Sequence, residues 1–337
     1  MPKKILVIQT AFIGDVVLAT GIIEKLHAFY PDAQLDLLVR KGNEGLLKNH
    51  PFVNVLIWNK KKQKLLNLFR LWIAIVRSRY DIVITIQRYA STGFLAGLSF
   101  AKQRIGFNKN PLSFLFTDSI PHAFDEGVHE VARNNRLIES ITNAVPARPR
   151  LYPESADSQL QSLKNVSYIC IAPASVWFTK QYPIEKWAEF LNRLPGDLTV
   201  YLLGGPEDAG LCKALQSNTS NTSITDLSGK LNFLESISLM RDARMNYVND
   251  SAPMHFASSV NAPVSVVYCS TVPAFGYGPL SDTSHIIELS EPLYCRPCGL
   301  HGHRKCPEDH FRCAYDIHVD QLLSPLTFQP ISSKTGA

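Results

Sequence analysis

Five loops carry the side chains best suited to chemistry, and each follows an apolar run and precedes a helical pattern. The first contains one glycine, Gly14, and then a carboxylate, Asp15, which would repel a diphosphate. The other four combine small residues with cations or hydrogen-bonding groups, and they span residues 172–183, 202–208, 226–230 and 248–255. Free N–H groups at helix starts suit phosphate, so these four loops together predict a nucleotide site. Any one of them alone is better explained as an ordinary helix cap.

The elements that must position these loops alternate between strand and helix, which predicts an α/β fold with doubly wound parallel sheets. In the first half, the predicted strands are Ile5–Gln9, Leu35–Val39, Val55–Trp58, Ile82–Ile86 and Arg104–Phe107. The predicted helices there are Val16–Tyr30, Leu65–Arg79, Thr92–Phe100 and residues 129–141. A polar segment before the last of these helices predicts irregular structure.

The same alternation restarts after a proline-rich stretch, which predicts two domains. The first covers residues 1–150 and the second covers residues 165–325, with a linker at 151–164 and a disordered tail at 326–337. Ligands of doubly wound sheets bind at the carboxyl ends of the strands, where all five loops are expected.

Composition sets broad limits on the function. The chain has 337 residues, 45% of them hydrophobic, which is enough for two cores of ordinary size. Its net charge of +5 is only mildly basic and gives little reason to expect nucleic acid as a partner. We find no signal peptide and no run of ~20 apolar residues, so we expect a cytoplasmic protein without a membrane span.

Three segments carry motifs in a specific order, namely IGDVVLATGIIEKLHAFYPDAQLDLLV, APASVWFTKQYPIEKW and VNDSAPMHFAS. Together they resemble the lipopolysaccharide heptosyltransferase family, glycosyltransferase family 9, and the similarity extends from Lys3 to about residue 320. The resemblance implies a GT-B fold of two Rossmann-like domains, in which the first holds the acceptor and the second holds the nucleotide-sugar. It also implies an inverting transfer without a metal or another cofactor. In agreement, the sequence has no Asp-x-Asp pair that would hold a divalent cation.

Matching these motifs gives each candidate residue a role. Asp15 would act as general base on the acceptor hydroxyl, Lys180 would neutralise the leaving diphosphate, and Asp250 would position the donor sugar or Lys180. The residues expected to contact the donor are Ser175, Thr179, Gly204, Gly205, Asp226, Asn249, Ser251, Ala252, Met254 and His255. Helix capping is the alternative for Asp15 and Asp250, and a solvent-facing loop charge is the alternative for Asp226.

Two positions depart from the family pattern. Ala252 stands where glycine commonly follows the Asp-Ser pair, and alanine would be strained there if the backbone needs a positive φ. Gly21 stands where proline is common. Because of these two departures, the motifs do not decide which nucleotide and which sugar the donor carries.

A basic segment, residues 60–79, contains Lys and Arg but no acid. A basic helix with an apolar face can lie on an anionic membrane, which would suit a lipid-anchored acceptor on the inner leaflet. The alternative is a helix packed on the sheet with only its basic end in solvent. The run Leu65–Val76 is so continuously apolar that we expect packing to cover most of it.

A cysteine cluster comprises Cys295, Cys298, Cys306 and Cys313, with three histidines interleaved. Its spacing resembles a zinc site, although the second and third ligands are closer than in common zinc ribbons. Reduced thiols, zinc and disulfides all stay open as interpretations. Because the cluster follows the last predicted core strand, we expect it to be structural and remote from the transfer step.

These features favour an inverting, metal-independent glycosyltransferase that moves a heptose from ADP-heptose to a lipid-anchored lipopolysaccharide inner-core acceptor. One alternative is the same fold with another nucleotide-sugar, and a second is a non-catalytic nucleotide-sugar-binding protein. A Rossmann dehydrogenase is disfavoured because no Gly-x-Gly-x-x-Gly follows the first predicted strand.

Overall fold

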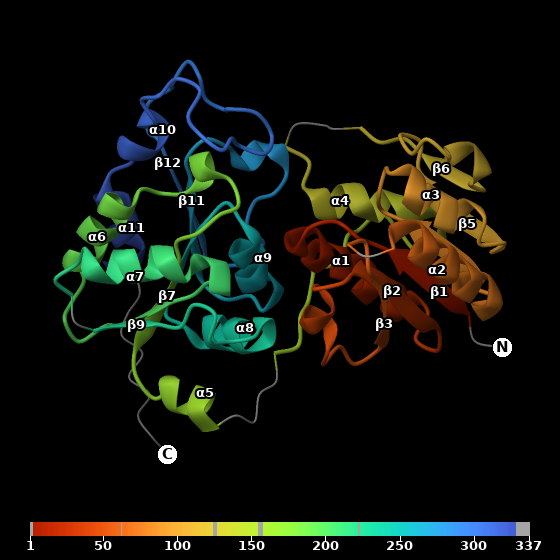
Figure 1. Ribbon diagram of the computed structural model, residues 1–337, viewed down its shortest axis with the longest axis horizontal. Coiled ribbons are helices and arrows are strands. Elements are labelled where there is room, and N and C mark those ends of the chain that lie inside the picture. The colour runs from red at the N-terminus through yellow and green to blue at the C-terminus, as the bar shows by residue number, and fades with distance from the viewer. Residues whose placement is uncertain (1–2, 62, 124–126, 154–157, 222, 328–337) are drawn as a thin grey trace. The chain divides into compact units, whose positions relative to one another are not determined.

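The computed structural model describes residues 3–61, 63–123, 127–153, 158–221 and 223–327. It contains two compact units (Figure 1). The first unit comprises the chain up to Glu154 together with Gly276–Gly278, and the second comprises the rest. A short piece of the second half of the sequence therefore belongs to the first unit.

The first unit contains a six-stranded sheet in which every pairing is parallel. Its strands lie in the order β3-β2-β1-β4-β5-β6. They are β1 (Lys4–Ile8), β2 (Gln34–Arg40), β3 (Val53–Trp58), β4 (Ile82–Thr85), β5 (Gln103–Phe107) and β6 (Asp118–Ile120). Ile5 to Ile8 are completely buried, as expected for a central strand covered on both faces. Strand β6 lies in the segment that was predicted to be irregular, because three residues with one apolar side chain give no strand signal.

The helices of the first unit differ modestly from prediction. They are α1 (Ile13–Phe29), α2 (Lys64–Ser78), α3 (Ala90–Gly97) and α4 (Glu130–Asn135), with 3₁₀ helices η1 (Glu44–Leu47), η2 (Ser113–Leu115) and η3 (Arg136–Ile141). Helix α1 begins three residues before the predicted start at Val16. Asp15 is consequently inside its first turn rather than in the preceding loop.

The second unit contains another six-stranded parallel sheet, in the order β12-β11-β10-β7-β8-β9. Its strands are β7 (Tyr168–Ala172), β8 (Thr199–Leu202), β9 (Ile224–Asp226), β10 (Asn246–Asn249), β11 (Val264–Tyr268) and β12 (Ser284–Glu288). Counted along the chain within each unit, both sheets have the order 3-2-1-4-5-6. The predicted doubly wound parallel architecture is confirmed in both units.

The helices of the second unit extend into the predicted linker and the predicted tail. They are α5 (Ser158–Leu163), α6 (Ile184–Asn192), α7 (Ala209–Ser217), α8 (Phe233–Asp242), α9 (Ala252–Ser259), α10 (Arg312–Tyr315) and α11 (Val319–Thr327), with 3₁₀ helices η4 (Phe178–Lys180), η5 (Pro206–Asp208) and η6 (Pro273–Phe275). The predicted linker contains helix α5, in which Leu160 is buried. Helix α11 extends into the predicted tail, and residues 328–337 lie outside the described residues.

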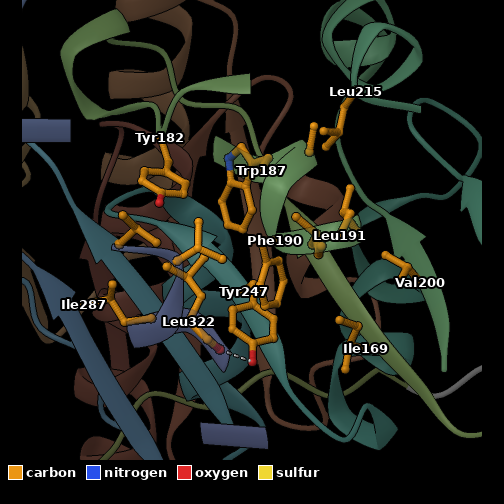
Figure 2. Close-up of a cluster of buried hydrophobic side chains, with 14 of the residues drawn as sticks. Ile169, Tyr182, Trp187, Phe190, Leu191, Val200, Leu215, Tyr247, Ile287 and Leu322 are labelled. Carbon is orange, nitrogen blue, oxygen red and sulfur yellow. Dashed lines mark hydrogen bonds between the residues drawn. The ribbon is translucent and has the colours of Figure 1, made fainter. Parts of the chain in front are cut away.

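Aromatic packing fixes helix α6 in the core of the second unit (Figure 2). The rings of Phe190 and Tyr247 lie 4.7 Å apart, and the Tyr247 hydroxyl donates to the Leu322 carbonyl at 2.8 Å. Tyr182 contacts Trp187 edge-on and donates its hydroxyl to the Ile317 carbonyl. Since Tyr182 lies two residues before the start of α6, these contacts also anchor the end of the loop that contains Lys180.

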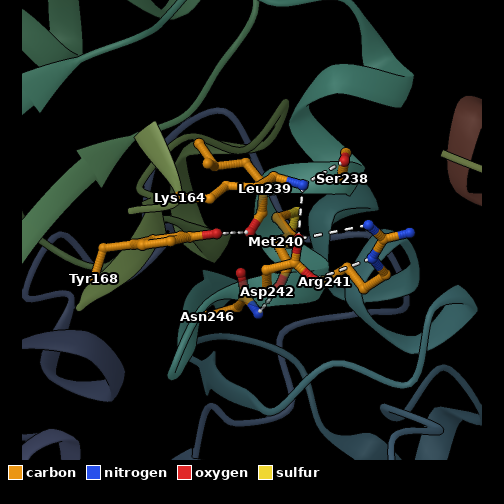
Figure 3. Close-up of polar contacts among 8 residues, drawn as sticks. All are labelled: Lys164, Tyr168, Ser238, Leu239, Met240, Arg241, Asp242 and Asn246. Atoms are coloured by element: carbon orange, nitrogen blue, oxygen red, sulfur yellow. Dashed lines mark hydrogen bonds and ion pairs between the residues drawn. The ribbon is translucent and has the colours of Figure 1, made fainter. Parts of the chain in front are cut away.

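Hydrogen bonds join the carboxyl end of helix α8 to the amino ends of two central strands, β7 and β10 (Figure 3). Tyr168 of β7 donates to the Leu239 carbonyl at 2.8 Å, and Asn246 of β10 donates to the Met240 carbonyl at 2.9 Å. Lys164 adds a positive charge there through its 2.6 Å contact with Asp242. These groups satisfy carbonyls that a helix end leaves without internal partners, and the cation complements the helix dipole.

Candidate functional site

The two central strands of the second unit bring a lysine and an aspartate together. In an open sheet of this order, the crevice for ligands lies outside the carboxyl ends of the first and fourth strands, here β7 and β10. Lys180 lies in the loop after β7, and Asp250 directly follows β10. The Lys180 Nζ and Asp250 Oδ2 atoms are 2.6 Å apart, and their side chains are only 14% and 10% exposed. This ion pair is the contact that one predicted role of Asp250, positioning Lys180, requires.

Thr271 completes this ion pair. Its hydroxyl donates to Asp250 Oδ2 at 2.6 Å, and the residue is almost completely buried after strand β11. Its carbonyl accepts a hydrogen bond from Arg296 at 2.8 Å, which fixes the backbone behind it. Sequence reasoning missed Thr271, although a polar residue after a buried strand next to β10 was a usable signal. Lys180, Asp250 and Thr271 form what we call the cation cluster.

Three residues expected to contact a donor have buried side chains that support the loops. Asn249 is completely buried, accepts from the Tyr182 backbone N–H at 3.0 Å and donates to the Pro173 carbonyl at 2.7 Å. Thr179 is 1% exposed, and its hydroxyl oxygen accepts from the His303 backbone N–H at 2.7 Å. Met254 is completely buried, and its sulfur accepts from the Tyr268 hydroxyl. The side chains of Asn249, Thr179 and Met254 thus support the loops, and donor contact at these positions stays a prediction, which for Met254 concerns its backbone N–H.

The glycine pair after β8 and Asp226 after β9 shape two neighbouring turns. Gly205 donates its backbone N–H to Asp208 at 2.8 Å, and a Cβ atom on Gly204 would lie 2.8 Å from the Cβ of Asp208. Asp226 accepts from the backbone N–H and the hydroxyl of Ser228. The carboxylate of Asp226 is thus part of a local turn.

The remaining predicted donor residues lie within five residues of Lys180 or Asp250 in the sequence. Ser251 is the N-cap residue of α9, and Ala252 is its first residue; both are partly exposed. His255, one turn further along α9, is 7% exposed. Ser175 is partly exposed in the loop before Lys180, and its carbonyl accepts from the Gln181 side chain at 2.6 Å.

The cysteine cluster is not remote from Lys180, which corrects the sequence-based expectation. Besides the bond from the His303 backbone to Thr179, a Cβ atom on Gly302 would lie 3.0 Å from Cγ of Lys180. The rings of Phe178 and Phe311 are 5.0 Å apart. Residues around the cysteines therefore pack directly against the loop that carries Lys180.

The thiols themselves give no evidence for zinc or disulfides. All seven cysteines are free, and Cys295 Sγ lies 3.9 Å from Nε2 of His310. Within the described part of the chain, no three His, Cys, Asp or Glu side chains are placed to hold a metal ion. Cys313 belongs to the hydrophobic core of the second unit, and burial raises the pKa of its thiol to about 12.

Asp15 lies in the first turn of α1, directly after strand β1 of the first unit. Its Oδ2 atom accepts from the Phe12 backbone N–H at 3.1 Å, so the carboxylate does stabilise the helix start. Burial raises the pKa of Asp15, while the positive charge of Arg40 partly opposes that shift. A cap and a base are compatible at this position, because a raised pKa makes a carboxylate a stronger proton acceptor.

The central strands of the first unit carry a polar group beside the Asp15 turn. Thr10, after β1, donates its hydroxyl to Gln87, after β4, and accepts from Nζ of Lys60 at 2.7 Å. Burial lowers the pKa of Lys60 to about 8. Sequence reasoning had assigned Lys60 to a basic helix, whereas the structure places it at the carboxyl ends of the strands.

A second carboxylate, Glu130, interacts electrostatically with Asp15. Burial raises the pKa of Glu130, Arg133 at 2.8 Å opposes that shift, and the negative charge of Asp15 reinforces it. The backbone N–H of Glu130 donates to the Gly276 carbonyl at 2.7 Å. Gly276 has a φ of +89°, and a Cβ atom there would clash with the Val128 carbonyl, so only glycine fits. No sequence signal placed Gly276 in the first unit.

Comparison with known proteins decides the family. The model of glycosyltransferase family 9 (heptosyltransferase) matches residues 68–310, which is well over half of the chain. The chain belongs to glycosyltransferase family 9. It is therefore a glycosyltransferase, as the motifs predicted.

Relatives of known function and structure agree with this family membership. Lipopolysaccharide heptosyltransferase 3 of Escherichia coli is 25% identical over 77% of this chain and 82% of the relative. Lipooligosaccharide heptosyltransferase 2 of Haemophilus influenzae is 23% identical over 86% of this chain and 89% of the relative. The structure of E. coli ADP-heptose LPS heptosyltransferase II matches with a TM-score of 0.79 and 20% identity, over 96% of this chain and 97% of that one. The predicted GT-B fold is confirmed.

The two departures from the family 9 pattern have simple structural explanations. Ala252 is the first helical residue of α9 and is not among the residues with positive φ, so alanine is unstrained there. Gly21 lies where α1 passes residues 147–149, and a Cβ atom would be only 2.8 Å from the Ala147 carbonyl. Ala252 therefore introduces no backbone strain, and Gly21 is explained by the close packing of α1 against residues 147–149.

None of the helices in the described part of this family 9 chain is both long and apolar enough to cross a membrane.

Proposed function

We propose that this glycosyltransferase moves a heptose from ADP-heptose to a lipopolysaccharide inner-core acceptor. The cation cluster carries the proposal, because it holds a largely buried ammonium group at the carboxyl ends of β7 and β10. The relatives support the donor and the pathway, since those described above are named for heptosyl transfer to lipopolysaccharide or lipooligosaccharide. In this proposal, the second unit binds the nucleotide-sugar and the first unit binds the acceptor.

Lys180 is proposed to act on the leaving group. When the bond between the anomeric carbon and the diphosphate breaks, the bonding electron pair leaves with ADP, and negative charge accumulates on the diphosphate. An ammonium group fixed in advance by Asp250 and Thr271 stabilises that charge without having to reorganise during the reaction. The partly exposed start of helix α9, with Ser251 and Ala252, offers backbone N–H groups of the kind that bind phosphate.

Asp15 is proposed to act as the general base. Its ionised carboxylate takes the proton from the acceptor hydroxyl as that oxygen forms a bond to the anomeric carbon of the heptose. Attack on the face opposite the departing ADP inverts the anomeric centre. Burial supports this role because it raises the pKa of Asp15, which increases the driving force for accepting a proton.

Metal-independent transfer is part of the proposal. Enzymes that lack a divalent cation must neutralise the leaving diphosphate with protein groups, and Lys180 is such a group. We therefore propose no catalytic metal and no other cofactor.

Mass spectrometry of products tests the proposal directly. The purified protein is incubated with ADP-heptose, and separately with other nucleotide-sugars, in the presence of inner-core oligosaccharide acceptors truncated at successive positions. We expect a mass increase of one heptose with ADP-heptose, and a different preferred donor would replace the heptose assignment. Binding of ADP-heptose without any product, on every acceptor, would instead favour a nucleotide-sugar-binding protein. The anomeric configuration of the product, read by NMR, tests inversion.

A further inference from the structure

Helix α2 has a wider apolar surface than the first unit buries. Ile75 is buried, and Leu68, Leu71 and Trp72 pack partly against the core of the first unit. The Trp72 indole N–H donates to the Leu98 carbonyl at 2.8 Å, which anchors α2 beside α3. These contacts cover one side of α2. The expectation that packing covers most of the run Leu65–Val76 is therefore wrong.

The uncovered part of α2 is a continuous apolar stripe. Leu65 is 75% exposed, Phe69 is 54% exposed and Ile73 is 39% exposed. Residues four apart share a helix face, so these three side chains lie in one row. Leu66, 47% exposed, lies in the adjacent row with Ile73. Large apolar side chains gathered on one exposed face mark an interaction surface, whereas scattered ones do not.

Basic side chains border this stripe. Arg70 and Arg77 are exposed and continue the row of Leu66 and Ile73 at helical spacing. Lys61, Lys64 and Arg79 are exposed at the two ends of the helix. Residues 60–79 contain no Asp or Glu, and α3, which packs against α2, contains no charged residue. We call Leu65, Leu66, Phe69, Ile73, Arg70 and Arg77 the α2 face.

We propose that the α2 face docks on an anionic lipid bilayer, with its apolar row in the interfacial region and its arginines among the headgroups. Interfacial helices combine an apolar row with flanking Lys or Arg in this way, and anionic lipids attract each basic residue near the surface. A second copy of the chain is a poorer occupant, because a two-fold contact would place these arginines against their own copies without any acid to balance them. The purpose of the contact, access to a lipid-anchored acceptor, rests on the proposed function. The contact itself is measurable without turnover.

Vesicle flotation tests the proposal with the full-length protein. We expect binding to vesicles of phosphatidylethanolamine and phosphatidylglycerol, and much weaker binding to phosphatidylcholine alone. The double variant Leu65→Gln/Phe69→Gln should bind the anionic vesicles about tenfold more weakly or worse, because the apolar row is lost. Arg70→Gln/Arg77→Gln should weaken anionic binding by about fivefold for each arginine, with less effect at high salt.

Matched controls keep the test decisive. Val145→Gln, at a side chain that is 70% exposed in the first unit but outside α2, should bind like the wild type. Thermal unfolding of Arg70→Gln/Arg77→Gln should stay unchanged, because both arginines are exposed. The Phe69 ring also contacts Trp72 and Phe94, so Leu65→Gln/Phe69→Gln should melt slightly lower while remaining folded at the assay temperature. Turnover of all these variants on a delipidated oligosaccharide acceptor should stay unchanged. Absence of wild-type binding to anionic vesicles at low salt would overturn the proposal. The proposal would also fail if the Leu65→Gln/Phe69→Gln variant bound anionic vesicles as tightly as the wild type. A loss of self-association in that variant without a loss of vesicle binding would overturn it too. If no donor is turned over at all, the proposed function fails while the flotation result still stands.

Discussion

Replacing Asp15 by Asn separates the two roles that its carboxylate combines. The substitution keeps an acceptor oxygen for the Phe12 backbone N–H but removes the ability to take a proton. Losing a positioned base lowers kcat/KM by ~10²–10⁴-fold, which corresponds to about 2.7–5.5 kcal/mol of activation free energy. Product formation by mass spectrometry at saturating ADP-heptose measures this drop, and calorimetric titration with ADP should give near wild-type affinity.

The pKa of Asp15 sets the sign of two pH effects. In the folded protein burial raises this pKa, so the folded state holds the proton more tightly than the unfolded state does. The contribution of Asp15 to stability is therefore fully present below the ordinary aspartate pKa of about 3.9 and is lost as pH rises through the raised value. At neutral pH the ionised, buried carboxylate of Asp15 costs stability, and Asp15→Asn removes that cost. The melting temperature of this variant at neutral pH should therefore be equal to or higher than that of the wild type. The acid limb of kcat/KM should also lie above the pH at which an ordinary aspartate titrates.

A matched control distinguishes base from cap. Glu235 occupies the same third helical position in α8 and accepts from the Asn232 backbone N–H at 2.8 Å. Asp15→Ala and Glu235→Ala each remove one such contact, with an expected loss of ~0.5–2 kcal/mol of stability. Only Asp15→Ala should also abolish turnover of the folded enzyme. If Asp15→Asn turns over at the wild-type rate, Asp15 is a helix cap and the base must be sought elsewhere.

Four further predictions concern the cation cluster, its support and the absence of a catalytic metal. Lys180→Ala should lower kcat and weaken ADP binding in steady-state and calorimetric assays, and unchanged values on both counts would remove Lys180 from the site. Thr271→Val deletes a hydrogen bond to a charged group worth ~1.5–3 kcal/mol, so kcat/KM should fall about tenfold to a hundredfold, whereas Thr271→Ser should stay near the wild type. Gly302→Ala, at a φ of +75° and against Lys180, should lower both the melting temperature and kcat, and a fully active variant would show that this loop does not support the lysine. Turnover should survive dialysis against a chelator, and activity restored only by a divalent cation would contradict metal-independent transfer.

The sequence alone determined those features that depend on neighbours along the chain. Apolar runs of four to six residues predicted most strands of both sheets, because burial on both faces leaves few polar positions. The chain segments that hold Asp15, Lys180 and Asp250 were found after strand ends for the same reason. Capping by Asp15 was also readable, since a helix start and its acceptor are close in sequence. The family motifs added roles that no periodicity could supply.

The tertiary structure decided which of these loops meet. Lys180 and Asp250 form an ion pair only because parallel strands β7 and β10 are neighbours, and Thr271 joins them from β11. Strand order is set by long-range pairing, which residue types in one segment do not encode locally. For the same reason, no local pattern showed that Gly276–Gly278 belongs to the first unit.

Burial, too, was decided by tertiary packing rather than by hydrophobicity. Met254 and Thr179 lie in predicted ligand loops but point into the interior, where neighbouring strands and the segment around His303 enclose them. Leu65 and Phe69 are apolar yet largely exposed, because α3 and the sheet pack mainly against the opposite side of α2. A sequence specifies how apolar a side chain is. Whether that side chain is buried depends on which other elements reach it, and those contacts exist only in the folded chain.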